Sequence, residues 1–498
     1  MKSQKPNKSL RVPEQEFLSP ILPRVKASKD YRDRKTLLEK CDELLGKSGI
    51  EIRLQEAALV KAQEQSDKVL TEKQRLHIQQ WTSQALRCNI ARILTGDSFR
   101  QFAFHLAESF LLQQFCRLIK FDTVHVPGKS TLQEYSEAFE VEEIQEIIHL
   151  LTGSAQKKSA EIGLEESFDD SVVLMDSTCM ELNIHFPVDW VLLRDALRTL
   201  TKAIECIRRH GLKSRIQTPS EFRKQMNKLC IAMTHQKRGK DSRKRRKEIL
   251  RQMKRLSRCV EKHGRRYHKL LSDQWEKTDL SQKEVDQILK RIDSILTQLP
   301  EAIDQAHERI IGERQVPNDR KILSLYESHS QVYHRGKAGK PTEFGLQLLV
   351  GESMDGLIVD WDLVEGAPKN DTQHLKPCIE RLQASGITIL EAVGDRGFAS
   401  LKNSKYLFQQ QIGDQLCPRG VIDLQKRLQE KEFVTFQKRR AQTEARISIL
   451  KHRFIGPTIP AKGIKRQKKH VAWSILTHNL WVIARKIITQ AEPMQQAA

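Results

Sequence analysis

The sequence lacks the features that identify several large classes of protein. No stretch approaches the roughly 20 apolar residues of a membrane-spanning helix. The nine cysteines include no Cys-x-x-Cys pair and the sixteen histidines no His-Glu-x-x-His motif, so zinc ribbons, disulfide frameworks and zinc catalysis have no sequence support. The start MKSQKPNKSLRVPEQ has no apolar signal-peptide core. We therefore expect a cytoplasmic chain with reduced thiols and no membrane partner.

A complete phosphate-binding loop is also missing. The stretch PGKSTLQEY at 127–135 contains Gly-Lys-Ser, but the motif requires a glycine five residues before Gly128, where this chain has Thr123. An ATPase of that class is therefore excluded. We expect instead a turn followed by a helix that Ser130 or Thr131 caps.

Acidic residues are outnumbered by basic ones. The chain has 85 Lys or Arg against 63 Asp or Glu, a net charge of +22, which indicates a polyanionic partner, with nucleic acid the first candidate. Residues 236–269 alone hold 16 Lys or Arg and three acids. Charge runs are usually solvated helix faces, but such a one-sided excess repels itself without an anion, so we favour DNA-backbone contact. The candidate contacts are Arg243, Lys244, Arg245, Arg246 and Lys247.

The 498 residues are too many for a single hydrophobic core, and the sequence changes character several times. The predicted segments are a flexible basic arm at 1-35, an all-helical N-terminal domain at 36-160, the first strand of an α/β domain at 165-186, a basic helical insertion at 187-320, the remainder of the α/β domain at 321-490 and a tail at 491-498.

Two apolar stripes at helical spacing predict an antiparallel helical hairpin within the insertion. The second helix opens with Ser281 and, three residues later, Glu284, which is a capping-box pattern. The first stripe consists of Ile249, Met253, Leu256 and Val260, and the second of Val285, Ile288, Ile292, Ile295 and Leu299.

Short apolar runs alternate with helical patterns in the α/β domain. SVVLMDST at 171–178 predicts a strand that ends on Asp176, and GITILEAVGD at 386–395 predicts one that ends on Asp395. Between them, FGLQLLVG and GLIVDWDLV predict a hairpin, and a helix follows at 371–384. A strand near DQLCP, a helix with Glu444 and the apolar helix VAWSILTHNLWVIARKI come last. We expect helices packed on a mixed sheet.

Asp176, Asp395 and Glu444 can share one site, because ligands tend to bind where the carboxyl ends of strands converge. Three close carboxylates repel one another unless divalent cations lie among them. Their oxygens suit Mg²⁺, with Mn²⁺ as a substitute, and a pair of such ions supports in-line displacement at phosphorus without a protein nucleophile. Each aspartate alone is equally well explained as a turn residue, but the coincidence of three acids favours a metal site.

Arg440 and Lys451 bracket Glu444 in the stretch RRAQTEARISILK. On a continuous α-helix the three side chains fall within roughly 40° of one another. An i,i+4 surface ion pair is the simplest explanation and contributes little stability. With partner carboxylates nearby, however, Glu444 can bind a metal ion while its two cationic neighbours bind a phosphate.

These residues resemble the DDE transposases of bacterial insertion sequences, in the branch with a Tyr-x-x-Arg-x-x-x-Glu-x-x-x-x-x-x-Lys signature. Arg440, Glu444 and Lys451 match that spacing. MDSTCMELNIHFPVDWVLL is similar to the family's first acid and its following Asn-Ile-x-x-Pro-x-Asp stretch, and GDRGF is similar to the motif of the second acid. GKAGKPTEFG at 336–345 and NDTQHLKP at 370–377 are further matches.

The resemblance implies an RNase H-like catalytic domain in which Asp176, Asp395 and Glu444 are the catalytic acids and the Mg²⁺ ligands. It also implies that Arg440 and Lys451 contact phosphates at the transposon end. The expected partners are terminal inverted repeats and target DNA, with the N-terminal domain binding DNA ends and two chains forming a homodimer in the complex. A bacterial, nucleoid-associated location follows.

Some positions depart from the family pattern. Gln437 stands where the signature has tyrosine, Gln347 stands where the family has lysine, and the aromatic residue after the second acid is Phe398. None of these is an expected metal ligand, so we expect altered DNA-end contacts before lost chemistry. Two alternatives stay open: an RNase H-like nuclease that cuts without joining, and a catalytically decayed DNA-binding protein.

Overall fold

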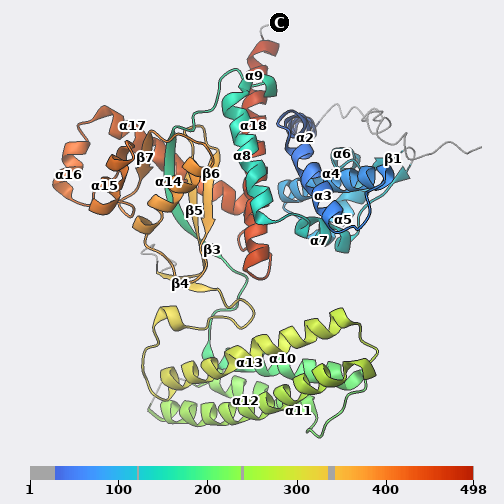
Figure 1. The fold of residues 1–498 in the computed structure, drawn as a ribbon. Coiled ribbons are helices and arrows are strands. Elements are labelled where there is room, and N and C mark those ends of the chain that lie inside the picture. Colours follow the sequence, from blue (N-terminus) through green and yellow to red (C-terminus); the bar gives the residue numbers. More distant parts are fainter. Residues whose placement is uncertain (1–27, 121–122, 237–239, 335–341, 497–498) are drawn as a thin grey trace, which may run out of the picture. The chain divides into compact units, whose positions relative to one another are not determined.

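The computed structural model describes residues 28–120, 123–236, 240–334 and 342–496, whose helices and strands are shown in Figure 1. The chain divides into two compact units. Unit 1 comprises residues 1–180, 347–364 and 369–498, and unit 2 comprises residues 181–346 and 365–368. Many helices accompany a mixed sheet, so the predicted α/β class is confirmed at that level. In the described ranges, no helix is long and apolar enough to cross a membrane.

Helices dominate the N-terminal part of unit 1. They are α2 (Lys29–Lys47), α3 (Ile50–Glu64), α4 (Glu72–Thr95), α5 (Phe99–Glu108), α6 (Phe110–Phe115), α7 (Lys129–Glu137), α8 (Val141–Lys157) and α9 (Ser159–Ile162). Strands β1 (Ile119–Lys120) and β2 (Thr123–Val124) pair antiparallel. The predicted all-helical domain therefore contains a small hairpin.

Two predictions for this region are wrong in detail. Helix α2 begins at Lys29, inside the predicted arm at 1-35, because Ser28 caps the helix by accepting a hydrogen bond from the Tyr31 N–H. The rest of that arm lies outside the described residues. The N-cap of α7 is Gly128, and no side chain caps the helix, so neither Ser130 nor Thr131 has the predicted role.

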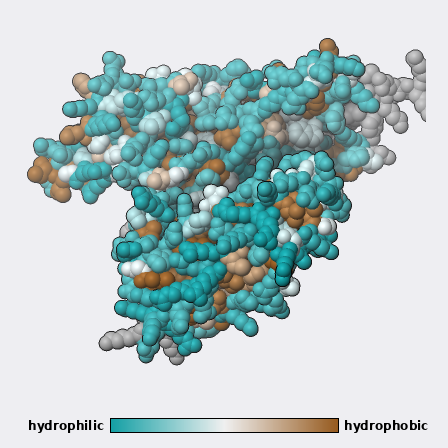
Figure 2. Space-filling model, turned by 60° about the horizontal axis from the view of Figure 1, so that its bottom comes forward, coloured by the Kyte–Doolittle hydropathy of each residue, from teal (hydrophilic) through white to brown (hydrophobic). Residues whose placement is uncertain are grey.

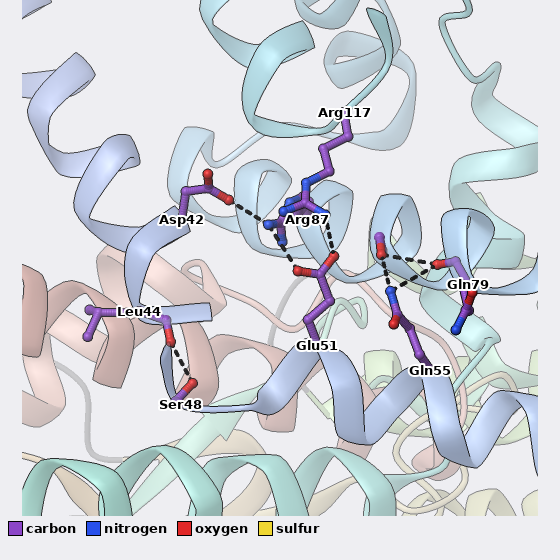
Figure 3. Close-up of polar contacts among 9 residues, drawn as sticks. Asp42, Leu44, Ser48, Glu51, Gln55, Gln79, Arg87 and Arg117 are labelled. Atoms are coloured by element: carbon purple, nitrogen blue, oxygen red, sulfur yellow. Dashed lines mark hydrogen bonds and ion pairs between the residues drawn. The ribbon is translucent and has the colours of Figure 1, made fainter. Parts of the chain in front are cut away.

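A buried arginine ties three of these helices together (Figure 3). Arg87 on α4 is fully buried and pairs with Asp42 on α2 and, at 3.2 Å, with Glu51 on α3. Arg117 pairs with the same Glu51 at 3.0 Å. Burial lowers the pKa of Arg87, and the Glu51 carboxylate acts in the opposite direction. Because a buried charge is costly when unpaired, this network fixes how α2, α3 and α4 pack.

A mixed sheet follows along the chain. Its strands are β3 (Val172–Glu181), β4 (Gln331–His334), β5 (Thr342–Glu352), β6 (Ile358–Leu363), β7 (Glu391–Gly394) and β8 (Gly413–Leu416), in the order β4-β5-β3-β7-β8, with β6 also paired to β5. β7 is parallel to β3 and to β8, whereas β5 is antiparallel to β4 and β6. The predicted hairpin of β5 and β6 is therefore confirmed.

Helix α17 (Lys431–Ile449) covers one face of this sheet. Val172 and Leu174 of β3 and Val393 of β7 form an apolar cluster, and Phe436 of α17 packs against it. Successive strand residues point to opposite faces. Every second residue of β3 from Val172 onward therefore faces α17.

Helix α14 (Leu375–Ala384) covers the other face. Val173 of β3 meets Cys378 of α14 across Gly351 of β5. A Cβ added at Gly351 would lie 3.2 Å from Val173 Cγ2 and 3.5 Å from Cys378 Sγ, so glycine is needed for this close packing. The predicted helix at 371–384 is present as the 3₁₀ turn η4 (Asp371–Gln373) followed by α14.

Three predicted boundaries in this domain are wrong. β3 does not end on Asp176 but continues to Glu181, because β5 still pairs along its other edge. The strand predicted over 386–395 is only Glu391–Gly394. The helix that bears Glu444 changes at Leu450 into a π-helical segment, η5 (Leu450–Ile455). Helices α15 (Leu401–Gln409) and α16 (Val421–Arg427) complete the region.

The C-terminal helix α18 (Ile464–Gln496) links the parts of unit 1. It packs along α8 and also contacts α2 and α4 (Figure 1). The Asn479 side chain accepts a hydrogen bond from the Ile358 N–H at 3.0 Å and donates to the Ile358 carbonyl at 2.9 Å, which ties α18 to β6. Most of the predicted tail at 491-498 is helical, and residues 497–498 lie outside the described residues.

The described helices of unit 2 are α10 (Asp189–Arg209), α11 (Pro219–Thr234), α12 (Lys240–Gln274) and α13 (Gln282–Ile310). They contact one another, and apolar residues of both predicted stripes enter their shared core. The capping box of Ser281 and Glu284 is present as predicted. On the face shown in Figure 2, hydrophilic residues predominate and hydrophobic ones form scattered groups.

Candidate active site

The register of the sheet brings Asp176 and Asp395 together. Met175 of β3 pairs with Gly394 of β7 in parallel register, so the next residue on each chain segment is one of the two predicted acids. Adjacent strands lie about 4.8 Å apart. Asp176 points to the α17 face because it lies two residues after Leu174, which packs there. β7 ends at Gly394, so both aspartates lie where the ladder between β3 and β7 stops.

Arg440 and Glu444 lie on α17, the helix that covers this face. The Nη1 atom of Arg440 is 3.9 Å from Oε1 of Glu444, and the Glu444 side chain is 69% exposed against 19% for Arg440. An exposed pair at this distance contributes little stability. Both residues nevertheless act electrostatically on Asp176.

The pKa of Asp176 is raised to about 6, with burial as the largest cause. The Ser177 N–H donates to Asp176 Oδ1 at 2.7 Å and lowers the pKa. The carboxylates of Asp395 and Glu444 raise it, and Arg440 lowers it. The three predicted acids therefore lie within electrostatic range of one another, and the ionised form of Asp176 is favoured by any added positive charge.

Gln437, at the tyrosine position of the signature, holds α17 against the strand ends. Its Nε2 donates to the Gln415 carbonyl of β8 at 2.8 Å and, less closely, to the Gly394 carbonyl of β7 at 3.4 Å. Its Oε1 accepts from Arg440 Nε at 3.1 Å. Gln437 therefore sets the position of Arg440 relative to the strand that precedes Asp395.

Lys451 lies beside the first strand, on the π-helical segment that follows α17. Its Nζ donates to the Cys179 carbonyl at 2.7 Å and to Thr178 Oγ1 at 3.3 Å. The expectation of one helical face assumed a continuous α-helix, but the helix that bears Glu444 changes at Leu450 into the π-helical segment η5, which carries Lys451.

A fourth carboxylate, which the sequence pattern alone does not mark, lies beside the two aspartates. Asp371 at the start of η4 accepts a hydrogen bond from Ser177 Oγ at 2.6 Å. Its other oxygen lies close to Gly397, where an added Cβ would be 2.5 Å from Asp371 Oδ2 and 2.9 Å from Asp395 Oδ1. The Gly397 N–H donates to Asp395 Oδ1 at 2.7 Å. Asp371 is therefore hydrogen-bonded to the residue after Asp176 and packed against the turn after Asp395.

The sequence contained a weak signal for Asp371. It belongs to the stretch NDTQHLKP, which resembles a family segment, but an acid that opens a helix is usually explained by favourable contact with the helix N-terminus. Only the fold shows that Ser177, directly after Asp176, reaches it.

A buried glutamate fixes α17 at a second point. Glu352 at the end of β5 is fully buried, and its Oε1 accepts from Arg439 Nη2 at 2.7 Å and from Arg446 Nε at 3.4 Å. Arg446 packs over Gly356, which has a φ of +93° and where a Cβ would lie 2.3 Å from Arg446 Nη2. Two arginines of α17 are thus clamped to the β5–β6 turn.

The predicted DNA contacts of the basic helix belong to unit 2, at the start of α12. Arg243, Lys244 and Arg245 are exposed. Arg246 Nη2 donates to the Gln236 carbonyl at 2.8 Å, and Lys247 pairs with Glu313 at 2.8 Å. Three of the five cations therefore present their charge to solvent.

The donor set suits a hard divalent cation, although the side chains are not gathered into a ligand cluster. Among the described residues, no three His, Cys, Asp or Glu side chains lie close enough together to hold a metal ion. Asp176 and Asp395 offer carboxylate oxygens, the ligands that Mg²⁺ and Mn²⁺ prefer. Burial is the main reason that the pKa of Asp176 is raised, and the neighbouring carboxylates of Asp395 and Glu444 add to it. The two aspartates therefore suit a divalent cation by their chemistry, whereas the exposed Glu444 does not join them in a ligand cluster.

Comparisons of this chain with protein-family models, with curated proteins and with solved structures found no match.

Proposed function

We propose that this chain is an insertion-sequence transposase that cuts DNA at terminal inverted repeats and joins the exposed ends to target DNA. The observation that carries the proposal is the placement of Asp176 and Asp395 side by side after paired strand residues, facing the helix that bears Arg440 and Glu444. The resemblance to DDE transposases assigns the same residues to catalysis. The bacterial cytoplasm, at the nucleoid, is the corresponding location.

The arrangement of the sheet supports an RNase H-like catalytic domain. If the edge strand β4 is set aside, β3 is the first strand, β5 and β6 are the second and third, and β7 is the fourth. Asp176 then lies on the first strand and Asp395 follows the fourth, as the resemblance implies. Glu444 lies on the late helix α17, with Asp176 directed at that helix.

The proposed reaction has two steps, and in each step one phosphorus–oxygen bond forms while another breaks. Water attacks the phosphorus at the transposon end, the bond from phosphorus to the 3′ oxygen breaks, and a 3′ hydroxyl is released. That hydroxyl then attacks a target phosphorus, whose own bond to a 3′ oxygen breaks. Divalent metal supplies activation of the attacking oxygen and stabilisation of the leaving oxygen when bound. Asp176, Asp395 and Glu444 would hold it.

The remaining residues of the site position DNA and one another. Arg440, oriented by Gln437, is placed to contact a phosphate next to the acids. Lys451 is tied to β3 through Cys179 and Thr178, the residues that follow Asp176 on that strand, and would contact a second phosphate. Terminal inverted repeats and target DNA are the proposed partners, and two chains in one complex would cut two ends.

The decisive experiment removes each acid in turn. Asp176→Ala, Asp395→Ala and Glu444→Ala should each abolish Mg²⁺-dependent cleavage of a labelled duplex taken from the DNA flanking the gene, while DNA binding, measured by fluorescence anisotropy, is retained. Asp423→Ala, at an exposed position on α16, is the matched control and should cleave normally. Full activity in any one of the three acid variants contradicts the proposal.

Two further measurements separate the alternatives. With a labelled oligonucleotide and a plasmid target, a transposase yields joined products, whereas a nuclease that only cuts yields none. Calorimetric titration of Mn²⁺ into the wild type and into Glu444→Ala tests for decay, since a vestigial site gives the same result for both proteins.

A further inference from the structure

A cavity in unit 2 is lined with cations, and none of its lining residues belongs to α12. It has a volume of about 450 Å³ and lies between α10 and α11. Arg194, Arg198 and Lys202 of α10, Arg223 of α11 and His185 line it. All of these residues belong to unit 2. Pockets of this size, within the range of roughly 300–1,000 Å³, hold small ligands.

The cations of α10 form a single row. Arg194, Arg198 and Lys202 are spaced by four residues, so their side chains lie one above the other on one helix face. Like charges at this spacing destabilise a helix by about 0.2–0.5 kcal/mol per pair. An anion held between them would remove that repulsion.

Protein carboxylates neutralise only part of this charge. Arg194 pairs with Asp195 at 3.1 Å, and Arg223 pairs with Glu205 at 2.8 Å.

The other two cations lack such partners. Arg198 and Lys202 are exposed and form no ion pair within the described residues. The Nη1 atom of Arg223 is buried and has no hydrogen-bond partner in the described part of the chain. Donors of the cavity are therefore available to a ligand.

The floor of the cavity is apolar. Leu197 and Met226 line it and are almost fully buried. Ionic contacts beside such a surface are screened less than contacts in open water. Guanidinium groups match phosphate oxygens through paired N–H donors, so the geometry favours a phosphate group over a carboxylate.

We propose that this cavity, the α10–α11 pocket, binds a backbone phosphodiester of duplex DNA. This inference rests on the proposed function, because it takes DNA as the partner. The inference goes beyond the proposed function because it assigns a second DNA-contact surface to α10 and α11, in addition to the exposed cations of α12. Bound DNA would place a phosphate between Arg198 and Lys202.

The test compares two double variants of the full chain that remove the same charge. Arg198→Gln with Lys202→Gln changes the pocket. Lys283→Gln with Lys290→Gln changes two exposed lysines of α13, on the same unit, that form no ion pair within the described residues. Binding of a labelled duplex is measured by fluorescence anisotropy over a series of salt concentrations, and circular dichroism checks that both variants fold.

The salt dependence decides between the outcomes. Each lost phosphate contact lowers the slope of log affinity against log salt by about 0.9, so the pocket variant should lose about 1 to 2 from the slope while the α13 variant keeps the wild-type value. An unchanged slope in the pocket variant, or an equal loss of slope in both variants, contradicts the proposal that the pocket binds a DNA phosphate. Weaker binding of a matched RNA without weaker binding of duplex DNA overturns the DNA assignment.

Failure of the pocket is distinguishable from failure of the proposed function. If the salt slope is unchanged in the pocket variant while the protein still cleaves DNA in a reaction that requires Asp176, only the proposed role of the pocket is contradicted. A wild-type chain that binds no duplex DNA overturns both proposals.

Discussion

Ser177 connects two carboxylates on opposite faces of β3. Asp176 points to the α17 face, and its neighbour Ser177 reaches Asp371 at the start of η4, on the α14 side. A turn through Gly397 brings Asp395 into the same group. Asp371 therefore contacts both backbone segments that carry the two aspartates, through the hydrogen bond from Ser177 and through close packing against Gly397.

Replacement of Asp371 by asparagine should impair cleavage without affecting DNA binding. Groups that orient metal ligands typically change metal affinity or activity by about 10–100-fold when they are replaced. The measurement is the cleavage rate as a function of Mg²⁺ concentration, with half-saturation moving to higher Mg²⁺ in Asp371→Asn.

The control for this prediction is Asp423→Asn, which removes an exposed carboxylate of α16. It should leave the Mg²⁺ dependence unchanged. If Asp371→Asn also leaves it unchanged, Asp371 has only a structural role.

At the scale of elements, contacts at two points along α17 hold the helix in position. Gln437 binds the ends of β7 and β8, and Arg439 and Arg446 bind the buried Glu352. Between these anchors the helix presents Arg440 and Glu444. We therefore expect a change at either anchor to affect Arg440 and Glu444 together.

Replacement of Glu352 by glutamine should destabilise the protein by about 3–5 kcal/mol. The substitution keeps the volume but removes the negative charge that two largely buried arginines share, and breaking a buried ion pair at one partner costs about that much. Urea denaturation measures the loss. Glu380→Gln, which removes an exposed i,i+4 pair with Lys376 at 3.6 Å, should cost no more than about 0.5 kcal/mol. Similar losses of unfolding free energy in the two variants would contradict a stabilising role for the contacts of Glu352 with Arg439 and Arg446.

Element types were easier to predict from the sequence than element ends. The β5–β6 hairpin and the capping box at Ser281 follow from local patterns. The length of β3 depends on β5 as a neighbour, and the π-helical segment that carries Lys451 contacts β3. Such contacts join residues far apart in the sequence, and periodicity within one segment does not report them.

The same limit applies to the candidate site. Strand ends and the family resemblance point to Asp176, Asp395 and Glu444, and the pairing of Met175 with Gly394 places the first two side by side. The sequence does not predict the α10–α11 pocket, because the cations that line it come from three separate segments of the chain.

At the scale of the whole molecule, two histidines of α18 should make stability depend on pH. His470 and His478 are buried, and burial lowers the pKa of each from 6.5 to about 4. Above pH 6.5 both are neutral in the folded and unfolded states, so the full free energy of unfolding is present. As the pH falls from 6.5 to 4, only the unfolded chain takes up protons, and the free energy of unfolding falls.

The expected loss by pH 4 is on the order of 3 kcal/mol for each histidine. Urea denaturation at pH 7 and at pH 5 measures its onset, and His478→Gln should reduce the difference between the two. His77→Gln, at an exposed position on α4, should leave the difference as in the wild type. An equal difference in wild type and His478→Gln would show that His478 does not govern the acid sensitivity.

The close packing around Gly397 limits which amino acids the site tolerates at this position. Even one methyl group there would overlap oxygens of both Asp371 and Asp395, whereas the side chain of its neighbour Arg396 is exposed. In a library with all substitutions at both positions, selected for DNA cleavage, survivors should vary freely at Arg396 and retain only glycine at 397. The narrowest genetic constraint on the site would then fall on a residue that has no side chain.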